Sequence, residues 1–466
     1  MASRFWYWPA GAMVVSTRLL KIRTMISELD TVGRPRPRLA RVFARYRYAV
    51  AALDQVALSV FGFALNLCLL RALPAADYGT VSLWMTMALF AVSVQGALVL
   101  GPLNIHAVAA AEPEAARLQS SLATVNFVTV LATAALAGIV NLVADAEWAS
   151  HDMLTVIAIP LFVAAGLYRE YCRSIAFSRR DMAMLLWVDG PYLAVTSACL
   201  VAMVLWPQRF AGLAAAFLAM TIGCLVSQLF VRLRGDGVGG RLFAPGWVAS
   251  YRRIGGEMAW SLTGVFANHV ETRSYVYIAT SLVGVASLGA INAVGLLFRP
   301  VSVLTTAWGQ SALPQLSAAL ANGRLTEFDR ALARALAASA IGSIALGLAL
   351  WLAWQPVEHY LLAGKYGDGL ALLLLWAAAS GAGVLRYVGS MGLVAAREFK
   401  FLATAQTVCG LLAAAATAGF ILWEGYTGAM WGIAIGNGLC FVWEMARLRD
   451  VRRRAAASGL RPTAQN

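Results

Sequence analysis

The sequence predicts an all-α polytopic membrane protein with about 12 transmembrane helices in two six-helix lobes around a central cleft. Three observations support this prediction. Hydrophobic residues make up 60% of the 466 residues and charged residues only 13%, with a mean hydropathy of +0.69. A soluble domain has about 45–50% apolar and about 25% charged residues, so a soluble core cannot absorb this excess. Recurring apolar runs and a one-sided distribution of basic residues are the other two observations.

Each apolar run is close to the roughly 20 residues that an α-helix needs to cross a hydrocarbon core. The connections are short: neither the longest expected outer loop, at about 356–368, nor the inner connection at about 232–256 can hold a folded catalytic domain. No G-x-x-x-x-G-K-[ST] motif occurs, which excludes an ATP-driven pump acting alone. The runs lie at about 49–70, 80–101, 121–143, 153–175, 184–206, 211–231, 257–280, 286–309, 333–355, 369–394, 402–423 and 427–446.

The basic residues predict the orientation. With the N-terminus in the cytoplasm, 31 of the 37 Lys and Arg residues fall in inner segments or at the inner ends of the adjoining spans, three (Arg71, Arg209 and Lys365) in outer segments and three deeper within spans. Cytoplasmic loops are enriched in Lys and Arg, and one misplaced span would reverse every later loop. We therefore expect a multi-pass protein of the bacterial inner membrane with both termini cytoplasmic. The basic charge is interpreted as a topology signal, and no nucleic-acid partner is expected.

The predicted organisation has five parts. They are a basic cytoplasmic N-terminal segment (1–48), a first six-helix lobe (49–231), a cytoplasmic linker (232–256), a second six-helix lobe (257–446) and a basic cytoplasmic tail (447–466). No cleavable signal peptide is expected in residues 5–16, because this apolar stretch is short and contains Pro9. The six cysteines form no C-x-x-C pair, so we interpret them as core residues and expect neither a metal nor a cofactor.

A faint internal repeat supports the two lobes. In the first half, Tyr78-Gly79 precedes a helix that ends at Gly101-Pro102, and in the second half Leu288-Gly289 precedes a helix that ends at Leu313-Pro314. The offsets are 210 residues between the glycines and 212 between the prolines. Two six-span halves share one orientation, so an axis along the membrane normal should relate them and leave a cleft between them.

Motifs spread over most of the chain resemble one family. They are Leu70-Arg71-x-Leu73 followed by Tyr78-Gly79, Leu288-Gly289 followed by Arg299-Pro300 and Pro314, Leu361-Leu362-Ala363-Gly364-x-Tyr366-Gly367, and Tyr168-Arg169 followed by Arg173-Ser174, Phe177 and Arg180. The pattern resembles the Wzx-like polysaccharide and O-antigen flippases of the multidrug/oligosaccharidyl-lipid/polysaccharide exporter superfamily. The resemblance implies alternating-access movement of an undecaprenyl-pyrophosphate-linked oligosaccharide across the inner membrane for O-antigen or exopolysaccharide assembly. Expected partners are this lipid-linked substrate, membrane lipid, and a polysaccharide polymerase with its export machinery.

Two other functions stay open at this point. A multidrug exporter of the same superfamily has the same architecture, and a membrane-embedded polysaccharide polymerase or glycosyltransferase is the alternative from the enzyme class. A major facilitator fold fits less well, because the expected G-x-x-x-D-R-x-G-R-like loop is absent after residue 102. The short loops favour a transporter that is not an enzyme.

Ionisable side chains within the predicted spans are the candidate site, because each costs about 2.5–3.5 kcal/mol at the bilayer centre on insertion scales. In the second lobe the clearest set is His269, Glu271, Arg273, Arg299 and Arg386. His269 and Arg273 share a helix face, while Glu271 points to the opposite side, so that either Glu271 pairs with a neighbouring helix or span seven is distorted. Next to Arg299, Pro300 is expected to bend span eight because it removes a backbone hydrogen bond.

These second-lobe charges allow two interpretations. In the first, Arg273, Arg299 and Arg386 bind the substrate pyrophosphate, because guanidinium forks suit phosphate oxygens, and His269 joins them. In the second, Glu271 neutralises one arginine, His269 is a hydrogen-bonded helix contact, and the remaining charges tie helices together.

Acidic residues are the candidates for coupling or gating. Besides Glu271, these are Asp54 in span one and Asp189 in span five, which stands before Gly190-Pro191. The resemblance implies that an acidic residue of span one binds a coupling proton or cation. Asp54 is only about 8 Å into its span at about 1.5 Å per residue, so a capping or inner-gate role is the alternative.

Overall fold

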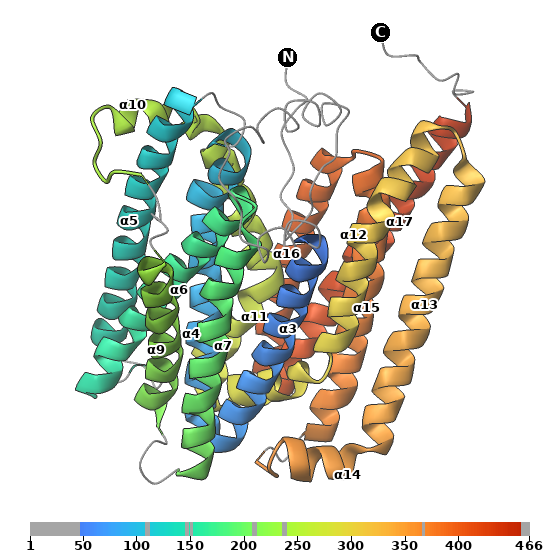
Figure 1. Ribbon diagram of the computed structural model, residues 1–466. Helices are drawn as coiled ribbons and strands as arrows, with labels where there is room; N and C mark the ends of the chain where they lie inside the picture. The colour runs from blue at the N-terminus through green and yellow to red at the C-terminus, as the bar shows by residue number, and fades with distance from the viewer. Residues whose placement is uncertain are drawn as a thin grey trace.

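The computed structural model describes residues 47–107, 112–144, 149, 152–206, 212–234, 240–365 and 369–457. Within these ranges the chain is almost entirely helical and has no strand, which confirms the all-α fold class (Figure 1). Some expectations lie outside the described residues: the N-terminal segment up to residue 46 with its apolar stretch, Arg209, the Tyr366-Gly367 motif and the tail beyond residue 457.

The first half of the chain forms one helical bundle (blue to green in Figure 1). Asp152 and Asp181 cap α6 and α7, each accepting a hydrogen bond from the backbone N–H three residues on, at 3.1 and 2.9 Å. α6 carries Arg169 and Arg173, and α7 carries Asp189. The elements are α3 (Arg47–Ala72), α4 (Ala75–Gln95), the π-helices η1 (Gly96–Leu100) and η2 (Leu103–Ala107), α5 (Glu112–Val143), α6 (Met153–Ser178), α7 (Met182–Leu205) and α9 (Leu213–Leu233).

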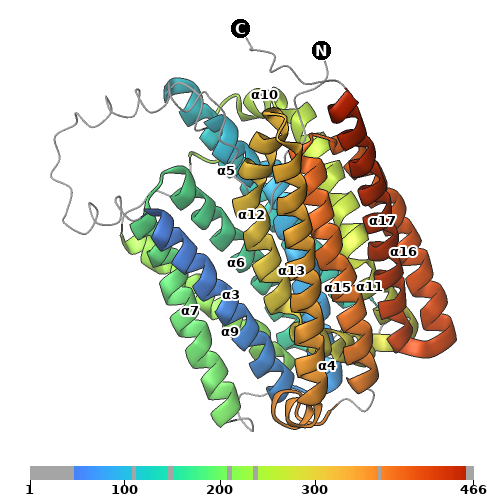
Figure 2. The ribbon, with the colours of Figure 1, turned by 90° about the vertical axis from the view of Figure 1, so that its right-hand side faces the viewer.

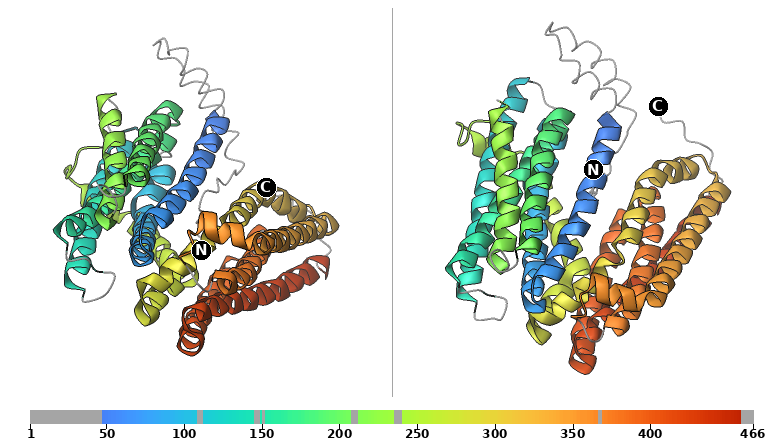
Figure 3. Two further views of the ribbon diagram at one scale, coloured as in Figure 1. Left: turned by 90° about the horizontal axis from the view of Figure 1, so that it is seen from below. Right: turned by 60° about the horizontal axis from the view of Figure 1, so that its bottom comes forward.

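The second half forms another bundle (yellow to red), which a linker with one short helix joins to the first (Figures 1 and 3). The linker helix is α10 (Trp247–Arg252). The elements of the second bundle are α11 (Gly255–Leu296), α12 (Arg299–Ala321), α13 (Leu325–Leu352), α14 (Trp354–Pro356), the π-helix η3 (Val357–Leu361), α15 (Gly369–Ala395), α16 (Phe399–Glu424), the 3₁₀-helix η4 (Gly425–Thr427) and α17 (Gly428–Ala457).

Ten stretches of the described chain are long and apolar enough to cross a membrane. The last of them, Phe399–Arg454, contains both α16 and α17, and α12 is not among the ten. With α12 included and α16 and α17 counted separately, each predicted run except 286–309 falls mainly in one long helix of its own, and 286–309 is divided between the end of α11 and the start of α12. The chain is therefore a multi-pass membrane protein.

The predicted eighth span is not one helix. Gly284 breaks α11 with φ 81° and ψ 170°, a conformation that favours glycine, so residues 285–296 run on as a separate helical segment. A second break precedes Arg299, where α12 starts with Pro300 in its first turn. There the proline removes no helical hydrogen bond, since the first N–H groups of a helix have no partner within it. The expected bend thus exists as a complete interruption beside Arg299.

Buried apolar side chains of the described residues form one shared core, two large separate ones and a small cluster around Cys409 in the second bundle. The shared core includes Leu69 of α3, Tyr78 of α4, Leu288 of α11 and Leu373 of α15, near the end of the molecule that carries α14. At the other end, which carries α10, each bundle has its own core, one around Leu122 and the other around Phe328. We call these the α14 end and the α10 end (Figures 1 and 2). The two lobes are therefore joined most extensively at the α14 end.

The glycines that the repeat aligns meet at this junction. A Cβ atom on Gly79 of α4 would lie 1.8 Å from the carbonyl oxygen of Val285 and 3.2 Å from the nitrogen of Gly289. A Cβ atom on Gly289 would in turn lie 2.6 Å from the carbonyl oxygen of Ala75. Only glycine permits this approach of two backbones.

Polar contacts reinforce the junction between the two lobes at the α14 end. Lys365, after η3, donates from Nζ to the carbonyl oxygens of Leu70 at 3.0 Å, Arg71 at 2.9 Å and Leu73 at 2.7 Å, at the C-terminus of α3. Arg71 donates in return to the carbonyl oxygen of Tyr360 at 2.6 Å. A cation at a helix C-terminus pairs with the negative end of the helix dipole. We call these contacts of Lys365 and Arg71 the end latch.

Candidate functional site

Intramembrane charges lie in three groups, and the first is a buried ion cluster in the second lobe. Arg386 of α15 pairs through Nη2 with Glu271 of α11, and its Nε lies 3.8 Å from Glu444 of α17. The side chains of Glu271 and Glu444 are only 5% and 0% exposed. Asn437 accepts a hydrogen bond from Arg386 at 3.0 Å, and Ser390 donates to Glu444 at 2.9 Å.

This cluster decides between the two alternatives for span seven. Glu271 pairs with a neighbouring helix, and α11 continues through residue 271 without distortion. The partner is Arg386 rather than Arg273 or Arg299. One guanidinium therefore faces two carboxylates. Arg386, which the sequence prediction placed among the phosphate ligands, forms its ion pairs with these two carboxylates.

The second group is a larger ion cluster in the first lobe, joining α3, α6 and α7. Asp189, with 1% of its side chain exposed, accepts from Arg169 at 2.5 Å and from Arg173 at 2.8 Å. Arg173 also lies 3.3 Å from Asp54 and 3.1 Å from Glu170. The structure thus brings Asp54 and Asp189 together around Arg173. Two guanidinium groups here face three carboxylates.

The third group consists of Arg273 and Arg299. Among the described residues, neither has a carboxylate within ion-pair distance, in contrast to Arg169, Arg173 and Arg386. Arg299 is exposed at the first residue of α12 and lies within electrostatic range of Arg273 and of Tyr78 on α4. The two arginines therefore form a positive region without a carboxylate partner in the described chain, and Arg299 lies near Tyr78 of the first lobe. We call it the free arginine pair.

His269 lies beside the free arginine pair, at the contact between α4 and α11. Its ring centroid is 4.3 Å from that of Phe90, and its Nε2 shares a hydrogen bond of 2.7 Å with the Tyr277 hydroxyl. These contacts hold His269 between the lobes. They leave it on the same helix face as Arg273, one turn away.

Part of both clusters is missing from the sequence prediction. Glu444 lies within the predicted twelfth span, and a single acidic side chain in an apolar run is the signal that could have found it. Arg169, Glu170 and Arg173 lie in the predicted fourth span, where the family-like motif includes the two arginines but not Glu170. The sequence alone identifies as candidates the free arginine pair, Arg386, His269 and the three carboxylates Asp54, Asp189 and Glu271.

Comparison with known proteins shows the fold. No family model and no curated protein matches the sequence. An inward-facing multidrug resistance MATE family transporter of the MOP superfamily has TM-score 0.64 at 12% identity, covering 86% of this chain and 99% of that one. The lipid II flippase MurJ, in an inward closed conformation, has TM-score 0.59 at 13% identity, covering 87% and 90%.

A third similar structure comes from Pyrococcus furiosus. This MOP superfamily transporter, described as having a binding pocket of reverse polarity that suggests a different function, has TM-score 0.51 at 13% identity and covers 88% of this chain and 94% of that one. The chain therefore has the fold of the MOP superfamily, and these three similar proteins are transporters rather than enzymes.

Proposed function

We propose that this protein is a flippase that moves a lipid-linked oligosaccharide, carried on undecaprenyl pyrophosphate, across the bacterial inner membrane for O-antigen or exopolysaccharide assembly. The free arginine pair, Arg273 and Arg299, binds the pyrophosphate. The sugars occupy the space between the lobes, the polyprenyl chain stays in lipid, and the lobes rock to expose the site on either side.

One observation carries the proposal. The chain neutralises Arg169, Arg173 and Arg386 with buried carboxylates, yet leaves Arg273 and Arg299 without one in the described residues. An uncompensated charge within a membrane is costly, so its retention points to an anionic partner that arrives with the substrate. Guanidinium groups hydrogen-bond phosphate oxygens in pairs and remain charged throughout a transport cycle.

The distribution of cores supports the mechanism. The lobes share one core at the α14 end and have separate cores at the α10 end, so their contact is least extensive at the α10 end. If the basic α10 end faces the cytoplasm, as the sequence predicts, this arrangement suits entry of a substrate assembled on the cytoplasmic side. The inward-facing MATE transporter and the inward closed MurJ structure share the fold of this chain.

The alternative is a multidrug exporter, which the similarity to a MATE transporter supports at the level of the fold. The electrostatics favour the flippase, because two uncompensated arginines repel a cationic drug and attract a phosphate. The reverse-polarity pocket described for the Pyrococcus furiosus transporter is a precedent for different site charges on this fold. The similarity to MurJ, a lipid II flippase, is a precedent for a lipid-linked substrate on it.

The decisive experiment is complementation of a strain that lacks its polysaccharide flippase, with immunoblots of the membrane fraction. We expect Arg273→Ala and Arg299→Ala each to abolish glycan export at near-normal abundance, because neither leaves a carboxylate unpaired. Arg→Lys at either position should retain part of the export, since charge survives without fork geometry.

The matched control is Glu271→Gln in each background. It should not restore export to Arg273→Ala or Arg299→Ala, because Glu271 pairs with Arg386. Rescue of both export and abundance by Glu271→Gln would assign that arginine to a structural pair and remove it from the substrate site. Full export by the double variant Arg273→Ala/Arg299→Ala would refute the pyrophosphate site.

A further inference from the structure

α12, the helix that begins at Arg299, is polar for a helix inside a membrane. Its 23 residues are enough to cross the hydrocarbon core. Among the long helices of the described chain, however, α12 alone is not apolar enough to count as a membrane-spanning stretch. Polar side chains at membrane depth face the interior of a helix bundle or a water-filled cavity. We therefore expect the polar side of α12 to line the space between the lobes.

The side of α12 that carries Arg299 is directed toward the first lobe, since Arg299 lies within electrostatic range of Tyr78 on α4. At about 100° per residue, Ser302 and Thr306 are within about 60° of Arg299 around the helix axis. Ser302 is exposed and Thr306 is half-buried. Leu304, which is 70% exposed, lies about 140° away from Arg299. Arg299, Ser302 and Thr306 thus form one polar stripe, which we call the α12 stripe.

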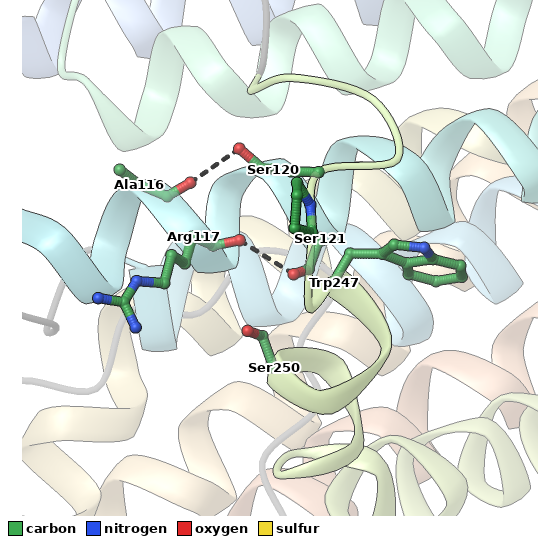
Figure 4. Close-up of a pocket in the computed structure, with 8 residues that line it drawn as sticks. Ala116, Arg117, Ser120, Ser121, Trp247 and Ser250 are labelled. Carbon is green, nitrogen blue, oxygen red and sulfur yellow. Dashed lines mark hydrogen bonds between the residues drawn. The ribbon is translucent and has the colours of Figure 1, made fainter.

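The hydroxyl of Ser302 is not engaged by its own helix. Ser120 and Ser121 of α5 show the common arrangement, in which the hydroxyl donates to the carbonyl oxygen four residues earlier, at 3.0 and 2.9 Å (Figure 4). The Ser302 hydroxyl makes no such bond, and it has no other partner in the described chain. An exposed hydroxyl at membrane depth is costly unless water or a ligand pairs with it. The Ser302 hydroxyl is therefore available to a ligand.

A tyrosine of α15 borders the α12 stripe. A Cβ atom on Gly309 would lie 2.7 Å from the hydroxyl oxygen of Tyr387, so the phenol lies directly against α12. The Tyr387 hydroxyl also interacts with the side chain of Thr306, three residues before Gly309. The Thr306 hydroxyl donates to the carbonyl oxygen of Ser302 at 2.8 Å, and its oxygen can still accept. Three hydroxyl groups, those of Ser302, Thr306 and Tyr387, therefore lie beside one another between α12 and α15.

These hydroxyls lie on the α10-end side of Arg299. α13 ends next to α14, so it begins at the α10 end, and α12 must end there as well. At about 1.5 Å per residue, Ser302 is about 5 Å and Thr306 about 10 Å from Arg299 along the helix axis. If a pyrophosphate is bound at Arg299 and the substrate enters from the α10 end, the attached sugars lie next to these hydroxyls. Sugar hydroxyls donate and accept hydrogen bonds, as Ser, Thr and Tyr hydroxyls do.

We infer that Ser302, Thr306 and Tyr387 form a sugar-binding site for the part of the glycan next to the pyrophosphate, in which the Ser302 hydroxyl hydrogen-bonds a sugar hydroxyl. The free arginine pair recognises the pyrophosphate of every such substrate, whereas this site recognises the sugar. A site that hydrogen-bonds a substrate hydroxyl discriminates against a compound that lacks it. The inference rests on the proposed function, because it requires the pyrophosphate at Arg299.

The test uses two probes that differ only in the sugar. They are undecaprenyl pyrophosphate and undecaprenyl pyrophosphate that carries one N-acetylglucosamine, each titrated into the purified full-length protein and followed by native mass spectrometry. The wild type should bind the glycosylated probe more tightly. Ser302→Ala should weaken binding of the glycosylated probe about fivefold, the effect of one hydrogen bond, and leave the bare probe unchanged. Ser302→Thr keeps the hydroxyl and should retain most of the affinity.

Two further variants complete the comparison. Tyr387→Phe removes a hydroxyl but keeps the ring, so it should also weaken only the glycosylated probe. The matched control is Ser311→Ala, which removes an exposed hydroxyl of α12 that lies about 120° from Arg299 and already donates to the carbonyl oxygen of Trp308 at 2.8 Å. Ser311→Ala should change the affinity for neither probe. Thermal unfolding in detergent verifies that each variant is folded.

The outcomes separate the sugar site from the proposed function. Equal binding of the two probes by the wild type, or unchanged binding of the glycosylated probe by Ser302→Ala, would overturn the sugar site. Arg299→Ala should weaken both probes, and this result would keep the pyrophosphate site even if the sugar site fails. Unchanged binding of the bare probe by Arg299→Ala would count against the proposed function instead.

Discussion

The two lobes differ in how they pair the arginines that lie within the predicted spans. The first lobe surrounds Arg169 and Arg173 with Asp54, Glu170 and Asp189, so every guanidinium in that cluster has a carboxylate partner. Of Arg273, Arg299 and Arg386 in the second lobe, only Arg386 has carboxylate partners in the described chain, namely Glu271 and Glu444. The comparison teaches that an arginine within a span is not by itself a substrate ligand. Its partners decide whether it is structural or available.

The largest expected effect is in the second-lobe cluster. Arg386→Ala leaves Glu271 and Glu444 buried together without a cation, and removing one partner of a buried pair costs about 3–5 kcal/mol. We expect a large fall in membrane abundance and in the melting temperature in detergent. Glu271→Gln should restore part of both, because it removes one stranded charge. Unchanged abundance of Arg386→Ala would show that Arg386 is not a structural partner and would return it to the candidate phosphate ligands.

A smaller effect is expected in the first-lobe cluster. Asp189→Asn keeps the shape of the side chain, and Arg169 and Arg173 still have Asp54 and Glu170 as acidic partners. The expected loss is about 1.5–3 kcal/mol, the range for hydrogen bonds to charged groups, and is measured by thermal unfolding in detergent. A loss of stability as large as that of Arg386→Ala would mean that Asp54 and Glu170 do not compensate Arg169 and Arg173 once the Asp189 charge is removed.

The smallest expected effect is in the end latch. Its removal tests whether the two lobes move relative to each other as rigid bodies. Lys365→Met removes three hydrogen bonds to the C-terminus of α3 while keeping an apolar side chain of similar length. We expect a shift of about 1 kcal/mol toward separation of the lobes at the α14 end, because the net contribution of such bonds is modest. Spin labels on α3 and α15 near that end, analysed as distance distributions, should report it.

The matched control is Lys365→Arg, which keeps the charge and should resemble the wild type. An unchanged distribution in Lys365→Met would count against the latch.

The fold followed from the sequence because a membrane constrains a chain strongly. Runs of about 20 apolar residues must be helices, and the charges at their ends predict the orientation, so composition and spacing were sufficient for the fold class. The interruption of span eight was only half predicted. Pro300 signalled a bend, whereas the structure has a complete break before Arg299; the break at Gly284 falls in the connection predicted between spans seven and eight, at about 281–285.

The pairing of charges did not follow from the sequence. Helix spacing placed Arg273 and His269 on one face, but the partner of Glu271 depends on how α11, α15 and α17 are rotated about their axes. Three arginines are therefore equivalent candidates in the sequence, and only the packing separates Arg386 from the other two. The repeat has the same limit: it aligns Gly79 with Gly289 without indicating that the two touch.

The free arginine pair also has an electrical consequence. A diphosphate ester carries one negative charge on each phosphate, so a loaded site with Arg273 and Arg299 would be neutral and the empty site would be positive. A membrane potential that is negative inside would then leave the loaded step untouched and pull the empty site back toward the cytoplasm, with about 2.3 kcal/mol per charge for each 100 mV crossed. In proteoliposomes, collapsing the potential should slow repeated turnover but not the first transfer. The voltage would thus drive the return of the empty carrier rather than the export of its cargo.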